Sequence, residues 1–149
     1  MTNDQPSSIK PAVREMIERL IAFDTTSRNS NLELIHFVRD YLHTLGVESE
    51  IVHDSEGSKA NLYATIGPRD RGGVALSGHT DVVPIDGQVW SVDPWRVSET
   101  DGKLFGRGTS DMKSFIAVAL AMVPRFLEKP LTMPLHLCLS YDEEVGCLG

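Results

Sequence analysis

The sequence predicts an α/β fold, with a mixed, largely parallel central sheet flanked by helices. Stretches of helical periodicity alternate along the chain with short apolar runs, an order typical of layered α/β domains. The runs at 74–77 and 135–141 have the length and composition of strands buried inside a sheet. The 149 residues suffice for one domain and hardly for two.

Two helices are predicted near the N-terminus, after a polar leader. The first starts at Pro11, a residue suited to a first helical turn, and runs to about Phe23. Its apolar residues have helical spacing: Val13, Ile17, Leu20 and Ile21. The second helix is expected to begin after Asn31 as its N-cap and to end at Gly46. Its apolar stripe consists of Leu34, Ile35, Val38, Tyr41, Leu42 and Leu45.

Strand patterns occupy the middle of the chain. Residues 47–52 and 62–66 are predicted strands, and the Gly- and Pro-containing residues 67–73 predict a turn. Residues 74–77 are predicted to form a short strand buried on both faces. A loop-rich stretch then extends from 79 to 109.

The C-terminal part of the chain contains a hairpin, a helix and a strand. Asp101-Gly102 indicates the hairpin, and residues 112–127 predict a helix buried on most of its surface. A strand at 135–141, if buried, needs helices on both faces, and only eight residues follow it. We therefore expect the chain to be the N-terminal part of a domain that continues beyond it.

Composition excludes several classes of protein. Fourteen Lys and Arg residues against 21 Asp and Glu give a net charge of −7, which disfavours nucleic-acid binding. The longest apolar run, 115–123, is nine residues and too short to span a bilayer. The polar N-terminus does not resemble a signal peptide, and two cysteines suit a reducing compartment. We expect a soluble, cytoplasmic protein with neither a membrane nor a nucleic-acid partner.

Three polar segments contain most of the residues that could bind a metal or catalyse a reaction. They are residues 77–84, 106–113 and 140–146. Ligands of open α/β sheets bind at the carboxyl ends of strands, where the segments 77–84 and 140–146 are expected to lie. Five carboxylates and an imidazole repel one another near neutral pH unless a cation compensates them. Mixed nitrogen and oxygen donors suit Zn²⁺, Mn²⁺ or Co²⁺. The candidates are His79, Asp81, Asp111, Asp142, Glu143 and Glu144.

Spacing suggests different roles within this set. His79 and Asp81 are two residues apart, so in an extended segment they point to the same side, and Asp81 is placed to orient the imidazole. Glu143 and Glu144 are adjacent, so an extended backbone would direct them apart. One of them would then bind metal while the other activates a water molecule.

Competing readings of these residues are weaker. Gly106 to Ser110 lacks the third glycine of a phosphate loop, and Asp111 stands where the anion would bind. Ser77, His79 and Asp81 are triad residue types, but they lie too close along the chain and no nucleophile elbow is present. A non-catalytic metal-binding module remains an alternative.

The segments SGHTDVVP, DGKLFGRGTSDMK and SYDEEVG closely resemble, in order and separation, the co-catalytic metallopeptidase and deacylase family. That family includes acetylornithine deacetylase, succinyl-diaminopimelate desuccinylase and aminoacylase. The resemblance extends over nearly the whole chain and is strongest to the acetylornithine deacetylases, with the desuccinylases second.

The resemblance implies two divalent metal ions, Zn²⁺ or Co²⁺, and a role for each residue. His79 resembles a terminal ligand of one metal, and Asp81 the aspartate that orients it. Asp111 resembles the bridging carboxylate, in a family where the next peptide bond is typically cis. Glu143 resembles the general base and acid, and Glu144 a ligand of the other metal.

The implied function is hydrolysis of a small N-acyl amino acid, N²-acetyl-L-ornithine, to L-ornithine and acetate in arginine biosynthesis. Family members supply further ligands and a lid domain from later sequence, and that lid mediates dimerisation. The full-length enzyme is therefore expected to be a homodimer, and residues 1–149 an inactive N-terminal portion of the catalytic domain. The alternative substrate is that of the desuccinylase.

Overall fold

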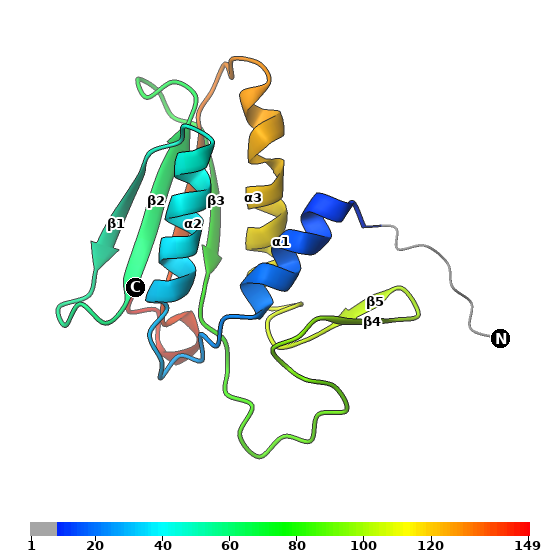
Figure 1. Cartoon of the computed structure of the whole chain (residues 1–149). Coiled ribbons are helices and arrows are strands. Elements are labelled where there is room, and N and C mark those ends of the chain that lie inside the picture. The colour runs from blue at the N-terminus through cyan, green and yellow to red at the C-terminus, as the bar shows by residue number, and fades with distance from the viewer. Residues whose placement is uncertain (1–8) are drawn as a thin grey trace.

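A computed structural model describes residues 9–149, which form a sheet covered by helices on one face (Figure 1). The helices are α1 (Pro11–Ile21), α2 (Leu32–Thr44) and α3 (Lys113–Leu127), with a 3₁₀ helix η1 (Glu143–Val145). The strands are β1 (Ser49–His53), β2 (Ala60–Ile66), β3 (Val74–His79), β4 (Ser98–Thr100), β5 (Lys103–Phe105) and β6 (Leu135–Ser140). The α/β class and each main element predicted from the sequence are confirmed.

The main sheet has the strand order β1-β2-β6-β3, and it is mixed. Only β3 and β6 pair in parallel, whereas β1 with β2 and β2 with β6 are antiparallel. The predicted largely parallel character is therefore wrong for the described residues. A short turn over residues 54–59 joins β1 to β2 and allows only antiparallel pairing, whereas α3 provides the crossover that the parallel pair needs.

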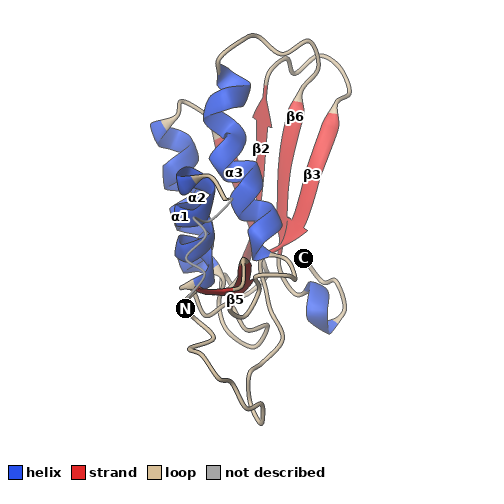
Figure 2. Ribbon diagram, turned by 90° about the vertical axis from the view of Figure 1, so that its right-hand side faces the viewer, coloured by secondary structure: helices blue, strands red, loops and turns tan. Residues whose placement is uncertain are grey.

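All three long helices lie on the same face of the sheet (Figure 2). Helices α2 and α3 contact the strands, and α1 packs mainly on α3. The buried apolar side chains of the sheet come from alternate strand residues: Ala60, Leu62, Ala64, Ile66, Leu137 and Leu139. The intervening residues His136 and Cys138 are only partly buried, and Val74 is 51% exposed. Within residues 9–149 no long helix covers the second face of β3 and β6 (Figure 2). Burial of these strands on both faces, which was expected to need sequence beyond this chain, therefore stays a prediction.

Helix α3 is confirmed, but its predicted burial on most of its surface is wrong. Ile116, Leu120 and Val123 are buried against the core, whereas Phe115 and Val118 are 42% and 43% exposed.

No helix of residues 9–149 has the length and apolar character needed to cross a membrane.

A proline inside α3 leaves one helical carbonyl without its usual donor. Pro124 has no N–H, so it cannot donate to the carbonyl of Leu120 four residues earlier. The Tyr41 hydroxyl of α2 donates to that oxygen instead, at 3.2 Å. The tyrosine hydroxyl therefore replaces the missing backbone donor and links α2 to α3.

We expect Tyr41→Phe to lower the free energy of unfolding by about 1 kcal/mol, the usual net value of such a hydrogen bond. In a Pro124→Ala background the alanine N–H can donate to Leu120, so the same tyrosine change should cost clearly less. Urea unfolding of the four variants measures both effects. An equal loss of unfolding free energy in the two backgrounds would show that the Tyr41 hydroxyl does not replace the missing donor.

Asn31 occupies the predicted N-cap position of α2, but its side chain makes no capping hydrogen bond. Instead its amide group pairs with both the N–H and the carbonyl of Ala60, at 2.9 and 2.8 Å, and also donates to Thr80 Oγ1 at 2.9 Å. Asn31 thus joins the start of α2 to β2 and to the segment that follows β3, where the candidate site lies.

The predicted hairpin is confirmed as β4 and β5. Its turn residues Asp101 and Gly102 have φ angles of 51° and 70°, the left-handed pair that favours Gly at the second position.

Candidate metal centre

The candidate residues gather where the two parallel strands end. His79 is the last residue of β3 and pairs in register with Ser140, the last residue of β6. The segment 80–82 and η1 therefore leave the sheet side by side, as expected for ligand sites at the carboxyl ends of strands. Asp111 reaches the same place from the loop that precedes α3.

His79 is buried, with 6% of its surface exposed, and its two ring nitrogens face different partners. Nδ1 lies 3.0 Å from the Asp81 carbonyl oxygen and 3.4 Å from its carboxylate Oδ1. Nε2 lies 2.9 Å from Asp111 Oδ1 and 3.8 Å from Glu143 Oε2. Because Nδ1–H has acceptors on Asp81, Nε2 is the nitrogen available to a metal.

Asp81 binds more than the imidazole. Its carboxylate accepts the backbone N–H of Glu143 at 3.1 Å and that of Glu144 at 3.2 Å. It also accepts the Ser27 hydroxyl at 2.7 Å. The nearer contact of His79 is with the Asp81 backbone, so the carboxylate mainly holds η1, a function that spacing alone did not predict.

Asp111 has a largely exposed side chain, 72%, on the open side of the cluster. The peptide bond from Asp111 to Met112 is cis, as the family resemblance implied. The exposed carboxylate and its contact with His79 are compatible with a metal-bridging role.

The loop before α3 is fastened by Lys113, which sequence reasoning missed. Its side chain is fully buried and donates to the Phe23 carbonyl oxygen at 2.6 Å. Burial lowers the pKa of Lys113 to about 7, against the raising effect of Asp24. Gly108, with φ 86°, leaves room for it, because a Cβ there would lie 3.1 Å from Lys113 Cδ. Lys113 thus joins the Asp111 loop to the end of α1.

Glu143 and Glu144 lie in a turn of 3₁₀ helix, so the predicted extended backbone is wrong. Both side chains reach the cluster, and one ligand atom from each lies within 4.8 Å of the other and of a His79 nitrogen. Glu143 is half exposed, and Glu144 is more buried. Asp142 turns away from the cluster and pairs with Lys59, so it is not one of the gathered donors.

The charge balance of the cluster fits a divalent cation. Asp81, Asp111, Glu143 and Glu144 surround one imidazole, and within residues 9–149 none of the four forms an ion pair with Lys or Arg. Burial raises the pKa of Glu144, and repulsion from Asp111 and Glu143 raises it further. An imidazole nitrogen with several carboxylate oxygens is a donor set that zinc and neighbouring metals accept.

Proton competition should make metal binding strongly pH dependent. Burial lowers the pKa of His79, but its contacts with Asp111 and Asp81 outweigh this and raise it above 6.5. The pKa of Glu144 likewise lies above its ordinary 4.5. These protonated forms stabilise the metal-free fold at low pH, and that contribution is lost as the pH rises through the folded-state pKa values.

We therefore expect zinc affinity to increase as the pH rises past both values, with protons released on binding. Titration calorimetry in two buffers of different ionisation enthalpy measures the release. An affinity independent of pH would show that the metal binds elsewhere.

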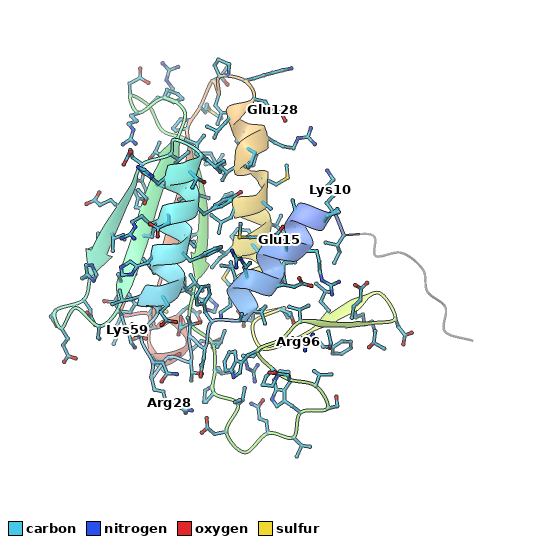
Figure 3. All side chains as sticks on the ribbon, viewed as in Figure 1. Lys10, Glu15, Arg28, Lys59, Arg96 and Glu128 are labelled. Atoms are coloured by element: carbon cyan, nitrogen blue, oxygen red, sulfur yellow. The ribbon has the colours of Figure 1, made fainter. Side chains whose placement is uncertain are left out.

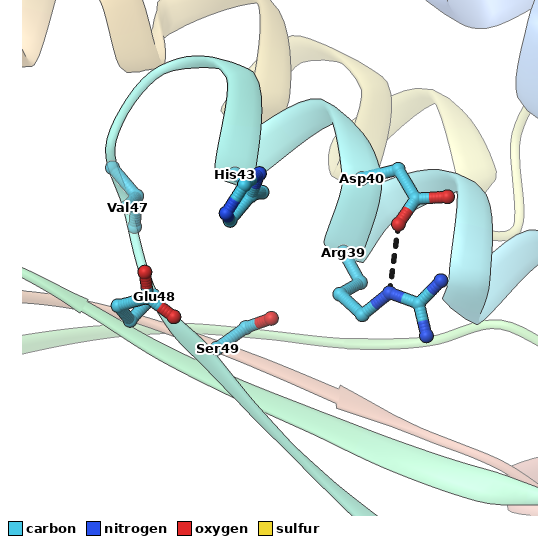
Figure 4. A pocket seen from close by; sticks show the side chains of 6 residues that line it. All are labelled: Arg39, Asp40, His43, Val47, Glu48 and Ser49. Atoms are coloured by element: carbon cyan, nitrogen blue, oxygen red, sulfur yellow. Dashed lines mark hydrogen bonds and ion pairs between the residues drawn. The ribbon is translucent and has the colours of Figure 1, made fainter.

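A hollow of about 290 Å³ lies apart from this centre, between the end of α2 and the start of β1 (Figure 4). Arg39 pairs there with Asp40 at 2.7 Å. Its residues are Arg39, Asp40, His43, Val47, Glu48 and Ser49. They do not form a metal-ligand cluster among the described residues.

An α/β domain with an imidazole and carboxylates at the ends of parallel strands has the donor set of a metalloenzyme. Residues 75–149 match the model of peptidase family M20/M25/M40, and the chain belongs to this family. It is 40% identical over 147 residues to an acetylornithine deacetylase of Pasteurella multocida, covering 93% of this chain and 38% of that protein. The chain thus spans well under half the length of this relative.

Solved structures show the same fold. Human carnosine dipeptidase 1 matches with a TM-score of 0.79 and 26% identity, over 91% of this chain and 33% of that one. The M20 family metallo-carboxypeptidase Sso-CP2 of Sulfolobus solfataricus matches with a TM-score of 0.77 and 21% identity, over 93% and 32%. The latter identity supports the fold alone.

Proposed function

We propose that the full-length protein is a metal-dependent amidohydrolase that removes the acyl group from an N-acyl amino acid. The observation that carries this proposal is that ligand atoms of His79, Glu143 and Glu144 lie within 4.8 Å of one another at the carboxyl end of the sheet. Asp111 adjoins this group through His79, at 2.9 Å from its Nε2. The proposed cofactor is a pair of divalent cations, with zinc favoured and cobalt as a substitute.

Each of the five residues has a distinct proposed task. His79 Nε2, Asp111 and Glu144 would hold the metals, and Asp81 would keep the imidazole and η1 in place. Bound divalent cations supply Lewis-acid polarisation of the scissile carbonyl and lower the pKa of water. Glu143, half exposed and 3.8 Å from His79, would accept a proton from the attacking water and return it to the leaving amine.

We propose N²-acetyl-L-ornithine as the substrate, with L-ornithine and acetate as products, in arginine biosynthesis. Support comes from the relatives named acetylornithine deacetylase, which include proteins of Pasteurella multocida and Myxococcus xanthus. A cytoplasmic location and a homodimeric full-length enzyme belong to the same proposal and rest on the family resemblance.

The number of protein ligands available to each metal ion suggests that residues 1–149 are one portion of the catalytic domain. With Asp111 shared, His79 and Glu144 give each of two metals only two protein ligands. Catalytic zinc sites ordinarily have three. We propose that residues outside this chain complete both sites, so the isolated 149 residues should bind zinc weakly and hydrolyse nothing.

Turnover of two substrates by the full-length, metal-loaded protein tests the proposed function. We expect hydrolysis of N²-acetyl-L-ornithine with a much higher kcat/KM than that of N-succinyl-diaminopimelate. A preference for the succinyl compound would overturn the substrate assignment but keep the amidohydrolase. Metal binding without hydrolysis of any N-acyl amino acid would favour the non-catalytic module.

A further inference from the structure

Lys59 lies between two segments that are remote from it in sequence. It immediately precedes β2 (Figure 3), and its ammonium group donates to Asp142 Oδ1 and to the Ser27 carbonyl oxygen, each at 2.5 Å. The side chains of Lys59 and Asp142 are only 16% and 10% exposed. This is a shielded ion pair in contact with the turn that carries Glu143 and Glu144.

The backbone of Lys59 is itself fixed. Its N–H donates to Asp54 Oδ1 at 3.2 Å, and its carbonyl accepts the Asp54 N–H at 2.9 Å. The ammonium group therefore starts from a rigid turn, and less conformational freedom is lost in holding its two acceptors.

Ser27 connects the same lysine to the metal cluster. Its carbonyl accepts from Lys59, and its hydroxyl donates to Asp81 Oδ2 at 2.7 Å. Its own N–H donates to the Val82 carbonyl at 3.1 Å. The connection between α1 and α2 is thus bonded at one residue to the lysine, to the Asp81 carboxylate and to the segment after β3.

We propose that Lys59 and Ser27 are positioning residues that hold η1 against His79. Two sets of contacts hold this turn. Lys59 donates to the carboxylate of Asp142, immediately before η1. Ser27 donates to the Asp81 carboxylate, which in turn accepts the backbone N–H groups of residues 143 and 144. The consequence for catalysis rests on the proposed function, whereas the consequence for the geometry of η1 does not.

We call the contacts of Lys59 and Ser27 the clamp, and η1 needs them for a physical reason. Helix η1 has only three residues, too few to hold its own conformation, and it follows Asp142 in a left-handed conformation with φ 57°. Without external contacts, Glu143 would move freely relative to His79. A displacement of about 1 Å can cost about 100-fold in rate, so fixing this turn matters to the reaction.

Lys59→Met tests the lysine, because it keeps the length of the side chain and removes its charge and donors. Lys59→Arg is the conservative variant, Lys103→Met on the exposed hairpin is the matched control, and Ser27→Ala tests the other arm. The readouts on the full-length protein are amide hydrogen exchange at residues 143 and 144, bound zinc, kcat and KM.

We expect Lys59→Met and Ser27→Ala to speed exchange of the Glu143 and Glu144 amides by at least about 10-fold, with β2 amides unchanged. In the zinc-loaded protein, kcat should fall by about 10-fold at unaltered KM, with most of it restored in Lys59→Arg. Lys103→Met should match the wild type in every readout.

Unchanged exchange at residues 143 and 144 in both variants would overturn the clamp, as would acceleration shared equally with β2. If Lys59→Met does not fold, Ser27→Ala decides the matter alone. If the wild-type protein hydrolyses no N-acyl amino acid, the proposed function fails, while the exchange measurement still tests the clamp.

Discussion

Glu143→Ala in the full-length protein should lower kcat by at least about 100-fold, the usual contribution of a general acid and base. Its carboxylate lies 3.8 Å from His79 Nε2 and is half exposed, so it adjoins the cluster and is open to solvent. Because no metal is assigned to it, bound zinc should stay at the wild-type content and KM should change little.

The isosteric variant Glu143→Gln separates proton transfer from shape. It keeps the size of the side chain but cannot take up a proton, so its kcat should fall as far as that of the alanine variant. Wild-type turnover by either variant would place the base elsewhere. Loss of zinc in both would instead make Glu143 a ligand, which its place within 4.8 Å of Glu144 and His79 also permits.

Glu144→Ala should act on metal content before it acts on rate. Removing even an outer partner of a metal ligand lowers affinity by about 10- to 100-fold, so the loss of a direct ligand should exceed about 100-fold. Elemental analysis after dialysis measures this, and we expect the variant to retain about half of the wild-type zinc. The matched control is Glu56→Ala in an exposed turn, which should leave zinc content unchanged. Full zinc occupancy in Glu144→Ala would remove this residue from the ligand set.

Local patterns in the sequence predicted most of the elements. The spacing of Ile17 and Leu20 and the left-handed turn at Asp101-Gly102 depend on neighbours only a few residues away. The pairing of strands depends on contacts between residues far apart in the sequence. For that reason the prediction of a largely parallel sheet was wrong for the described residues. The apolar run of β6 also concealed an alternation, in which Leu137 and Leu139 face the helices while His136 and Cys138 do not.

The candidate site shows the same division. His79, Asp81, Asp111, Glu143 and Glu144 were proposed from composition and spacing, and the structure brings them together, although their individual roles remain predictions. The supporting contacts are long range, because Lys59 is 83 residues from Asp142 and Ser27 is 54 from Asp81. A polar run between two predicted helices, TTSRNSN, was the only local signal of the second contact.

X-ray diffraction from crystals of the zinc-loaded full-length protein, recorded at the zinc absorption edge, tests the metal centre most directly. We predict two anomalous peaks at the carboxyl ends of β3 and β6. One should lie about 2.0–2.1 Å from His79 Nε2, and the other within about 2.2 Å of a Glu144 oxygen, with Asp111 between them. Strong zinc peaks elsewhere, with His79 Nε2 and Glu144 bound to no metal, would contradict the assignment of this cluster as the catalytic centre.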